Sequence, residues 1–262
     1  MRPIQPRKLP ELAPRRREVL HAVIREHIAS ALPVASAELV RRYRMGVSAA
    51  TVRAELAALE ELGLLTHPHT SAGRVPTDLG YRYFIEALMP HPDLREDERV
   101  TLSHQFRQAR PDTSEWLRLA ASTLARLTRE AAIATYDREL EPHEVTWSRQ
   151  IYYEGIDLIL TQPEFRVGDR VLGVVSLLQD RQLLSQVLPG SLGEGDVAVS
   201  IGSEHALEPL RPFSLVIGRY GTDKTVGYVG VVGPTRMDYH RTIGAVRYVG
   251  ALMSDLVRAL DG

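Results

Sequence analysis

Helix-breaking residues divide the first 90 residues at short intervals, and this spacing restricts what the segment can fold into. Apolar residues at helical spacing run over about 14–31 and stop at Pro33. A second, shorter helix ends near Gly46, which permits a turn. A third helix begins after Ser48, which can cap it, and stops at Gly63. The segment therefore begins with three short helices that follow one another closely.

A small β-hairpin is predicted directly after the third helix. The apolar pieces LLTH and RVPT enclose a turn-rich centre, and a fourth helix starts near Asp78. Three helices, a hairpin and one more helix in fewer than 80 residues describe a helix-turn-helix with a wing. In that motif the second helix of the pair lies in the major groove of DNA, and its N-terminal residues face the base edges.

The third helix supplies the first candidate contacts. Its expected buried face contains Val52, Leu56, Leu59 and Leu62, so the residues near its N-terminus point outward. Hydroxyl groups can bind phosphates or bases, alanine can contact a thymine methyl, and arginine can bind guanine or a phosphate. The candidates are Ser48, Ala50, Thr51 and Arg53. A helical bundle with a capping serine and a solvated arginine is the alternative.

The distribution of charge favours a polyanion as the partner of this segment. Residues 1–90 hold 13 Lys and Arg against 9 Asp and Glu, whereas the remainder holds 19 against 24. Arg15, Arg16 and Arg17 begin a helix, where the helix dipole favours anions, so an external polyanion would offset their placement. In the alternative, this helix end is solvated and is compensated in part by Glu18 and Glu26.

The loop HPHTSAGRVP, residues 67–76, is interpreted as the wing tip. Its two histidines lack a third ligand nearby, a nucleophilic serine would lack a positioned base, and no lysine follows the glycine as in a phosphate-binding loop. As a wing, the loop has a glycine for the turn, and hydroxyl and basic groups for phosphates or the minor groove. The candidate contacts are His69, Thr70, Ser71 and Arg74.

The second half of the chain predicts an α+β domain. Valine- and isoleucine-rich segments at 131–136, 196–202, 213–220 and 225–233 are predicted strands, and helices are expected at about 147–161 and 169–187. One amphipathic helix begins near Tyr239, after the turn GPTRMDY, in which Asp238 is placed to cap it. This half offers no clustered acid, base or nucleophile, so neither an enzyme, a cofactor nor a metal site is expected.

The composition excludes several other classes of protein. The chain contains no cysteine, which rules out disulfides, cysteine-based zinc sites and a thiol nucleophile. The basic N-terminus lacks the apolar segment of a signal peptide, and no stretch approaches 18 consecutive apolar residues. These features predict a cytoplasmic protein that does not associate with membranes.

Several stretches together resemble one family, the HrcA heat-inducible transcription repressors of bacterial chaperone genes. They are ATVRAELAALEELGLL, PHTSAGRVPTDLGYRYFIEALM, IGSE and GPTRMDY. The resemblance covers about residues 12–90 strongly and 196–258 well. It implies a winged-helix domain, a GAF-like domain, and a dimer that binds an inverted-repeat operator, the CIRCE element. It also implies that the chaperonin GroEL keeps the repressor active.

The chain departs from the family pattern between Tyr136 and Ile151, where several strands and the start of an inserted dimerisation region are reduced to a short polar link. Residues 151–165 resemble a helix of that insertion. Two surfaces are therefore candidates for dimerisation: the predicted helix around 151–160 and the apolar stripe along the last helix. In the alternative, the stripe of the last helix packs on the GAF-like sheet. The candidate residues are Leu158, Ile243, Val246, Met253 and Leu256.

The expected organisation has a flexible basic arm over 1–12, a winged-helix DNA-binding domain over 13–92, and a reduced GAF-like α+β domain over 93–262. The last would carry a short helical insertion at about 147–187. The expected function is sequence-specific repression of chaperone genes by a dimer on an inverted repeat. The alternative is a metabolite-responsive regulator whose GAF-like domain binds a small ligand.

Overall fold

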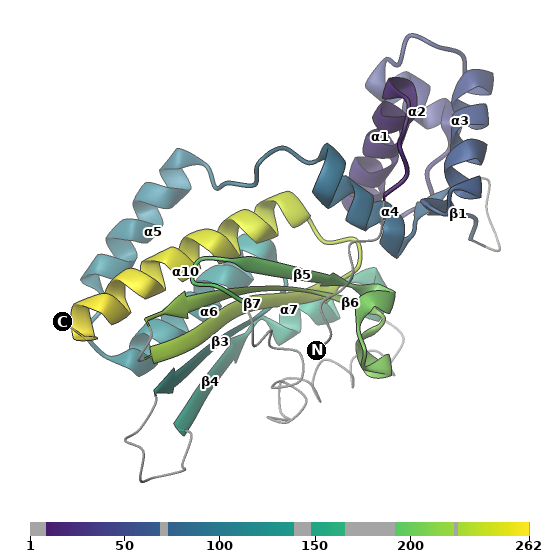
Figure 1. Ribbon diagram of the computed structural model, residues 1–262. Coiled ribbons are helices and arrows are strands. Elements are labelled where there is room, and N and C mark those ends of the chain that lie inside the picture. The colour runs from purple at the N-terminus through teal and green to yellow at the C-terminus, as the bar shows by residue number, and fades with distance from the viewer. Residues whose placement is uncertain (1–8, 69–72, 139–147, 166–191, 223–224, 262) are drawn as a thin grey trace. The chain divides into compact units, whose positions relative to one another are not determined.

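The computed structural model describes residues 9–68, 73–138, 148–165, 192–222 and 225–261 (Figure 1). The chain divides into two compact units. The N-terminal unit comprises Arg2–Pro90 together with Thr235–Met237, and the C-terminal unit comprises essentially His91–Pro234 and Asp238–Gly262.

The N-terminal unit contains the predicted order of helices and hairpin. Strands β1 and β2 pair antiparallel, and Val34 adds an isolated bridge to Arg74, so the hairpin gains a third extended segment. The winged helix-turn-helix expected from the breaker spacing is therefore present. Its elements are α1 (Pro14–Ser30), α2 (Ser36–Tyr43), α3 (Ala49–Glu61), β1 (Leu65–Thr66), β2 (Val75–Pro76), α4 (Asp78–Tyr83) and a π-helical turn, η1 (Phe84–Leu88).

Local capping explains where α3 begins and ends. The Ser48 side chain accepts a hydrogen bond from the Thr51 N–H at 3.1 Å, which satisfies one of the free donors of the first turn. At the other end, Gly63 has a φ of 70°, a left-handed conformation that glycine adopts without a steric penalty. Between these ends, Val52, Leu56 and Leu59 are buried, as their spacing predicted. Leu62 was expected on the same face but is 38% exposed, because it is the C-cap residue, beyond the last helical turn.

Two glycines of the N-terminal unit allow segments to approach more closely than any side chain would permit. A Cβ at Gly73 would lie 2.8 Å from the carbonyl carbon of Pro33, beside the bridge that joins Val34 to Arg74. A Cβ at Gly80 would overlap the carbonyl oxygen of Leu64, which precedes β1. Both glycines therefore serve the packing of the wing.

The C-terminal unit is a five-stranded antiparallel sheet with helices, in the strand order β4-β3-β7-β6-β5. The α+β class is therefore confirmed. Its elements are α5 (Glu96–Gln108), α6 (Thr113–Thr128), β3 (Ala131–Arg138), β4 (Ser148–Glu154), α7 (Ile156–Leu160), η2 (Pro163–Phe165), β5 (Val197–Ile201), η3 (Gly202–Glu204), η4 (Glu208–Leu210), β6 (Phe213–Gly221), β7 (Thr225–Pro234) and α10 (Tyr239–Asp261).

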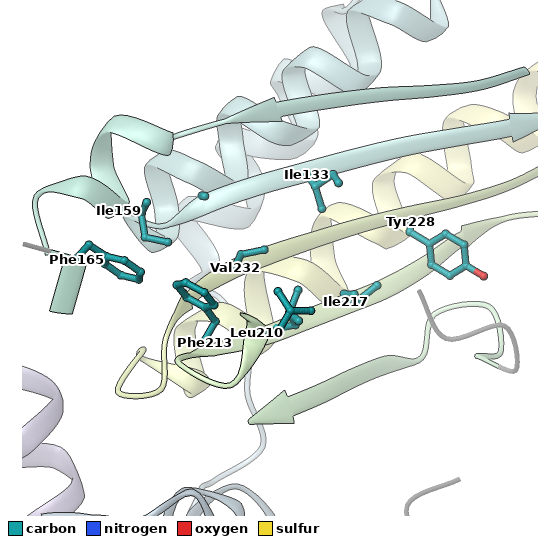
Figure 2. Packing of buried hydrophobic residues seen from close by; sticks show 10 residues of the cluster. Ile133, Ile159, Phe165, Leu210, Phe213, Ile217, Tyr228 and Val232 are labelled. Atoms are coloured by element: carbon teal, nitrogen blue, oxygen red, sulfur yellow. The ribbon is translucent and has the colours of Figure 1, made fainter. Parts of the chain in front are cut away.

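The two faces of this sheet are covered by different elements. Helices α6 and α10 contact each other and the strands on the face that carries Gly218 and Val229. On the opposite face, side chains from β3, β6 and β7 meet Ile159, Leu210 and Phe165, and the rings of Phe165 and Phe213 stack at 5.3 Å (Figure 2). The sheet is therefore covered on both faces.

The helix predicted over 147–161 is wrong for most of its length. Residues 148–154 form β4, which pairs with β3 so that Ile151 lies opposite Thr135. Isoleucine and two tyrosines favour a strand once a neighbouring strand is available for pairing, and Gly155, with a φ of 80°, ends it. Only Ile156–Leu160 is helical, and the helix predicted over 169–187 lies outside the described residues.

The stripe on the last helix belongs to the core of the C-terminal unit. Ile243, Val246 and Met253 are buried, and α10 contacts β6, β7 and α6. Asp238 accepts a hydrogen bond from the Arg241 N–H at 3.1 Å, as expected of a cap. Of the two interpretations of this stripe, the structure supports packing on the sheet, and Leu256 is only partly exposed.

The described helices include none with both the length and the hydrophobicity that a transmembrane span requires.

Candidate nucleic-acid interface

The N-terminal end of α3 presents a small polar surface to solvent. Ser48 and Ala50 are exposed and Thr51 is partly exposed. The hydroxyl groups of Ser48 and Thr51 lie 3.0 Å apart, so Ser48 is engaged both with this neighbour and with the cap. The first backbone N–H groups of a helix have no partner inside it, and together with the helix dipole they attract anions. This end of α3 therefore suits a phosphate or an electronegative base edge.

Arg53 stands one turn further along α3 and is exposed. It forms no ion pair or hydrogen bond within the described part of the chain. Its guanidinium is therefore free to bind an external acceptor, as the sequence predicted.

Two further free arginines precede α3 and were missed by the sequence analysis. Arg41 lies near the end of α2 and Arg44 caps it, and both are exposed with no partner among the described residues. Arg44 has a φ of 48°, which places a non-glycine residue in the left-handed region. The signal was the basic run RRYR directly before the turn at Gly46, which also suits the negative end of the α2 dipole.

The three arginines at the start of α1 have different environments. The Arg16 guanidinium pairs with Glu55 of α3 at 2.9 Å, and Arg17 donates to the Leu12 carbonyl oxygen at 2.9 Å. Arg15 is exposed and has no partner in the described part of the chain. Glu55, rather than Glu18 or Glu26, compensates the charge here, and only Arg15 remains free.

At the base of the wing, Arg74 is held by two side chains and is not a free cation. Its Nε lies 2.9 Å from a carboxylate oxygen of Glu60 on α3, and a second guanidinium nitrogen bonds His67 Nε2. Because arginine only donates, His67 Nε2 accepts, and His67 Nδ1 donates to Glu60 at 2.6 Å. The hydrogen bond from His67 and the charge of Arg74 lower the pKa of Glu60. His69, Thr70 and Ser71 lie outside the described residues.

A buried carboxylate fixes α2 against α1. Glu26 is 4% exposed and forms an ion pair with Arg42 of α2. The Tyr43 hydroxyl lies 3.5 Å from the same carboxylate, and burial together with the charge of Glu26 raises the pKa of Tyr43. Since α2 and the turn after it lead into α3, this pair positions the exposed end of α3.

The residues that the structure describes contain no group of three or more His, Asp or Glu side chains arranged to hold a metal ion. A helix-turn-helix with a wing, free arginines around α3 and an accompanying α+β unit define a DNA-binding transcription regulator.

Comparison with known proteins identifies its family. A model of the family described as HrcA protein C terminal domain matches residues 138–243. The heat-inducible transcription repressor HrcA of Roseiflexus sp. (strain RS-1) is 36% identical, over 96% of each chain. That of Herpetosiphon aurantiacus is 35% identical, over 96% of this chain and 97% of its own. The chain belongs to the HrcA family of heat-inducible transcription repressors, and is a repressor rather than an enzyme.

Two further findings concern the fold and the length of the chain. A crystal structure described only as that of a hypothetical protein has a TM-score of 0.74 and 20% identity, and the match covers 95% of this chain and 99% of that one. It supports the fold alone. The alignment with the Roseiflexus repressor runs over 345 positions, whereas this chain has 262 residues. The relative therefore contains segments without a counterpart here, as expected of a shortened member.

Proposed function

We propose that this repressor binds an inverted-repeat operator of the CIRCE type as a homodimer in the cytoplasm and silences chaperone genes. Residues 13–92 act as the DNA-binding domain, residues 1–12 as a basic arm, and residues 93–262 as the GAF-like domain. The exposed N-terminal end of α3, with free arginines on both sides of it in sequence, is the observation that carries the DNA-binding part. The chaperonin GroEL is proposed as a protein partner because the family resemblance implies it.

Within this interface the residues have different roles. Arg53 and Thr51 read base edges, while the first N–H groups of α3, beside Ser48 and Ala50, bind a phosphate. Arg15, Arg41 and Arg44 bind neighbouring phosphates, and His69, Thr70 and Ser71 contact DNA from the wing. Arg74 acts by fastening the wing to α3, because its guanidinium is already paired with Glu60 and His67.

The homodimer follows from the symmetry of an inverted repeat, because one winged helix occupies only one half-site. Since Ile243, Val246 and Met253 are buried, we place the dimer contact at β4 and α7 instead. Tyr153 and Leu160 there are 43% and 42% exposed, and Leu158 is partly exposed. Large exposed apolar side chains of this kind are typical of protein contacts when they lie together.

The operator experiment tests this proposal. The full chain is titrated against a chaperone-promoter inverted repeat in a gel shift, with and without the chaperonin, and its mass is measured by sedimentation. A dimer that shifts the repeat, and does so more strongly with the chaperonin, is expected. Leu158→Glu is expected to give monomers with weakened operator binding. A wild-type chain that stays monomeric on the operator would contradict the dimer.

Arg44 permits a test in which stability and DNA affinity change in opposite directions. Arg44→Gly removes a phosphate contact but also the left-handed strain, so unfolding free energy should hold or rise by up to about 1 kcal/mol. Operator affinity should fall for every sequence, and the slope of log affinity against log salt should decrease by about one per half-site.

The matched control for this experiment is Arg129→Gly. Arg129 caps α6 of the C-terminal unit, is exposed, and has a φ of 61°. It carries the same side chain in the same conformation, so its replacement should change stability similarly and leave operator affinity unchanged. Equal effects of both substitutions on affinity would count against a phosphate contact at Arg44.

A further inference from the structure

The hairpin of α5 and α6 contains a groove that the proposed interface with DNA does not use. One cavity in it, of about 280 Å³, is close to the roughly 300 Å³ at which small-molecule pockets begin. A second cavity of about 410 Å³ continues along the same helices and shares Gln105 with the first. The first is lined by Asp97, Glu98, Thr101, Leu102 and Gln105 of α5 and by Thr123, Arg126 and Leu127 of α6.

Two polar atoms among the lining residues are buried without a hydrogen-bond partner in the described part of the chain. They are Oγ1 of Thr123 and Oε1 of Gln105. Thr123 has no exposed surface, and a helical threonine usually bonds the carbonyl oxygen one turn earlier, which it does not do here. Because a buried polar atom without a partner has lost its hydrogen bonds to water and gained none in return, a hydrogen bond from outside the protein would stabilise both atoms.

The charged groups around the cavity are of both signs. Arg126 is exposed and forms no ion pair within the described residues, whereas the Asp97 carboxylate is 70% exposed and lies 3.5 Å from the equally exposed Arg95 guanidinium. Glu98 is fixed in place, because Arg241 of α10 donates to it at 2.7 Å. Leu102 and Leu127 add apolar surface beside these groups. The lining therefore offers one cation, acceptors for an ammonium group, and an apolar wall.

We propose that this cavity binds a small zwitterion of the α-amino-acid type. Arg126 and the Thr123 hydroxyl receive its carboxylate, Gln105 Oε1 and Asp97 accept hydrogen bonds from its ammonium group, and Leu102 and Leu127 contact its side chain. The C-terminal unit is then an effector-binding unit. This inference rests on the α5–α6 groove alone and does not depend on the dimer or the operator.

The test is isothermal titration calorimetry of the full chain with each of the twenty amino acids. At least one is expected to bind with a millimolar Kd or tighter, and its methyl ester and N-acetyl derivative are expected to bind at least about tenfold more weakly. Failure of every amino acid to bind the wild-type chain overturns the proposal. Operator binding by the same preparation separates that failure from a failure of the proposed function.

Two substitutions locate the site. Arg126→Gln is expected to weaken binding by about tenfold or more, whereas Arg129→Gln, an exposed arginine that does not line the cavity, is expected to leave it unchanged. Thr123→Val keeps the shape of the side chain but removes the unsatisfied hydroxyl. It is therefore expected to raise the Tm of the ligand-free protein and to weaken binding. Unchanged affinity in both Arg126→Gln and Thr123→Val contradicts the assigned cavity.

Discussion

Gly80→Ala is expected to unfold the N-terminal unit or to leave it marginally stable. The added Cβ would overlap the carbonyl oxygen of Leu64, which cannot retreat easily because it accepts a hydrogen bond from the Thr77 N–H at 3.1 Å. The Leu64 N–H is itself bonded to the Leu59 carbonyl oxygen at 3.0 Å. A clash with backbone that is fixed at both ends should cost about 3 kcal/mol or more, a large part of the stability of a small domain.

Amide hydrogen exchange followed by mass spectrometry measures this effect unit by unit. Protection should be lost in α3 and α4, retained in the C-terminal sheet, and accompanied by loss of operator binding. The control is Gly250→Ala in α10, where the added Cβ would meet Val229 at an ordinary 3.6 Å. Since alanine favours a helix over glycine by about 1 kcal/mol, that variant should be as stable as the wild type or more so. Normal protection of α3 and α4 in Gly80→Ala would show that α4 can move away from the Leu64 carbonyl group without unfolding the unit.

Arg53→Ala is expected to have the largest effect on sequence recognition. If Arg53 binds a base, its loss should cost about 1–3 kcal/mol of operator binding and should relax discrimination at one position of each half-site. Fluorescence anisotropy with the operator and with single-base variants of it measures both quantities. Because Arg53 is exposed and free of described partners, the unfolding free energy should change little.

Two other arginines serve as comparisons for Arg53. Arg74→Ala should weaken binding to all sequences alike, because it releases the wing from Glu60 and His67 without removing a base contact. Arg107→Ala, at an exposed position on α5, should leave operator binding unchanged. If Arg53→Ala retained full base discrimination, the base contacts would have to come from other residues of α3 or from the wing.

The sequence alone determined most of the N-terminal unit because its signals are local. Helical periodicity and the breakers Pro33, Gly46 and Gly63 act within a few residues, and so does the Ser48 cap. The exposed end of α3 followed from the same periodicity, because buried positions three and four residues apart leave the others outside. Strands β3, β5, β6 and β7 were likewise predicted from their valine- and isoleucine-rich composition.

Only the tertiary structure decided features that depend on residues far apart in the chain. Residues 148–154 are a strand because β3 supplies backbone partners, and the stripe of α10 is core because the sheet and α6 cover it. The sequence does not distinguish Arg16 and Arg74 from Arg53. In the structure, Arg16 pairs with Glu55, and Arg74 is bound by Glu60 and His67. Sequence periodicity predicts whether a side chain lies inside or outside. Whether its charge is neutralised depends on whether folding brings an oppositely charged residue within about 4 Å, and the local sequence does not show this.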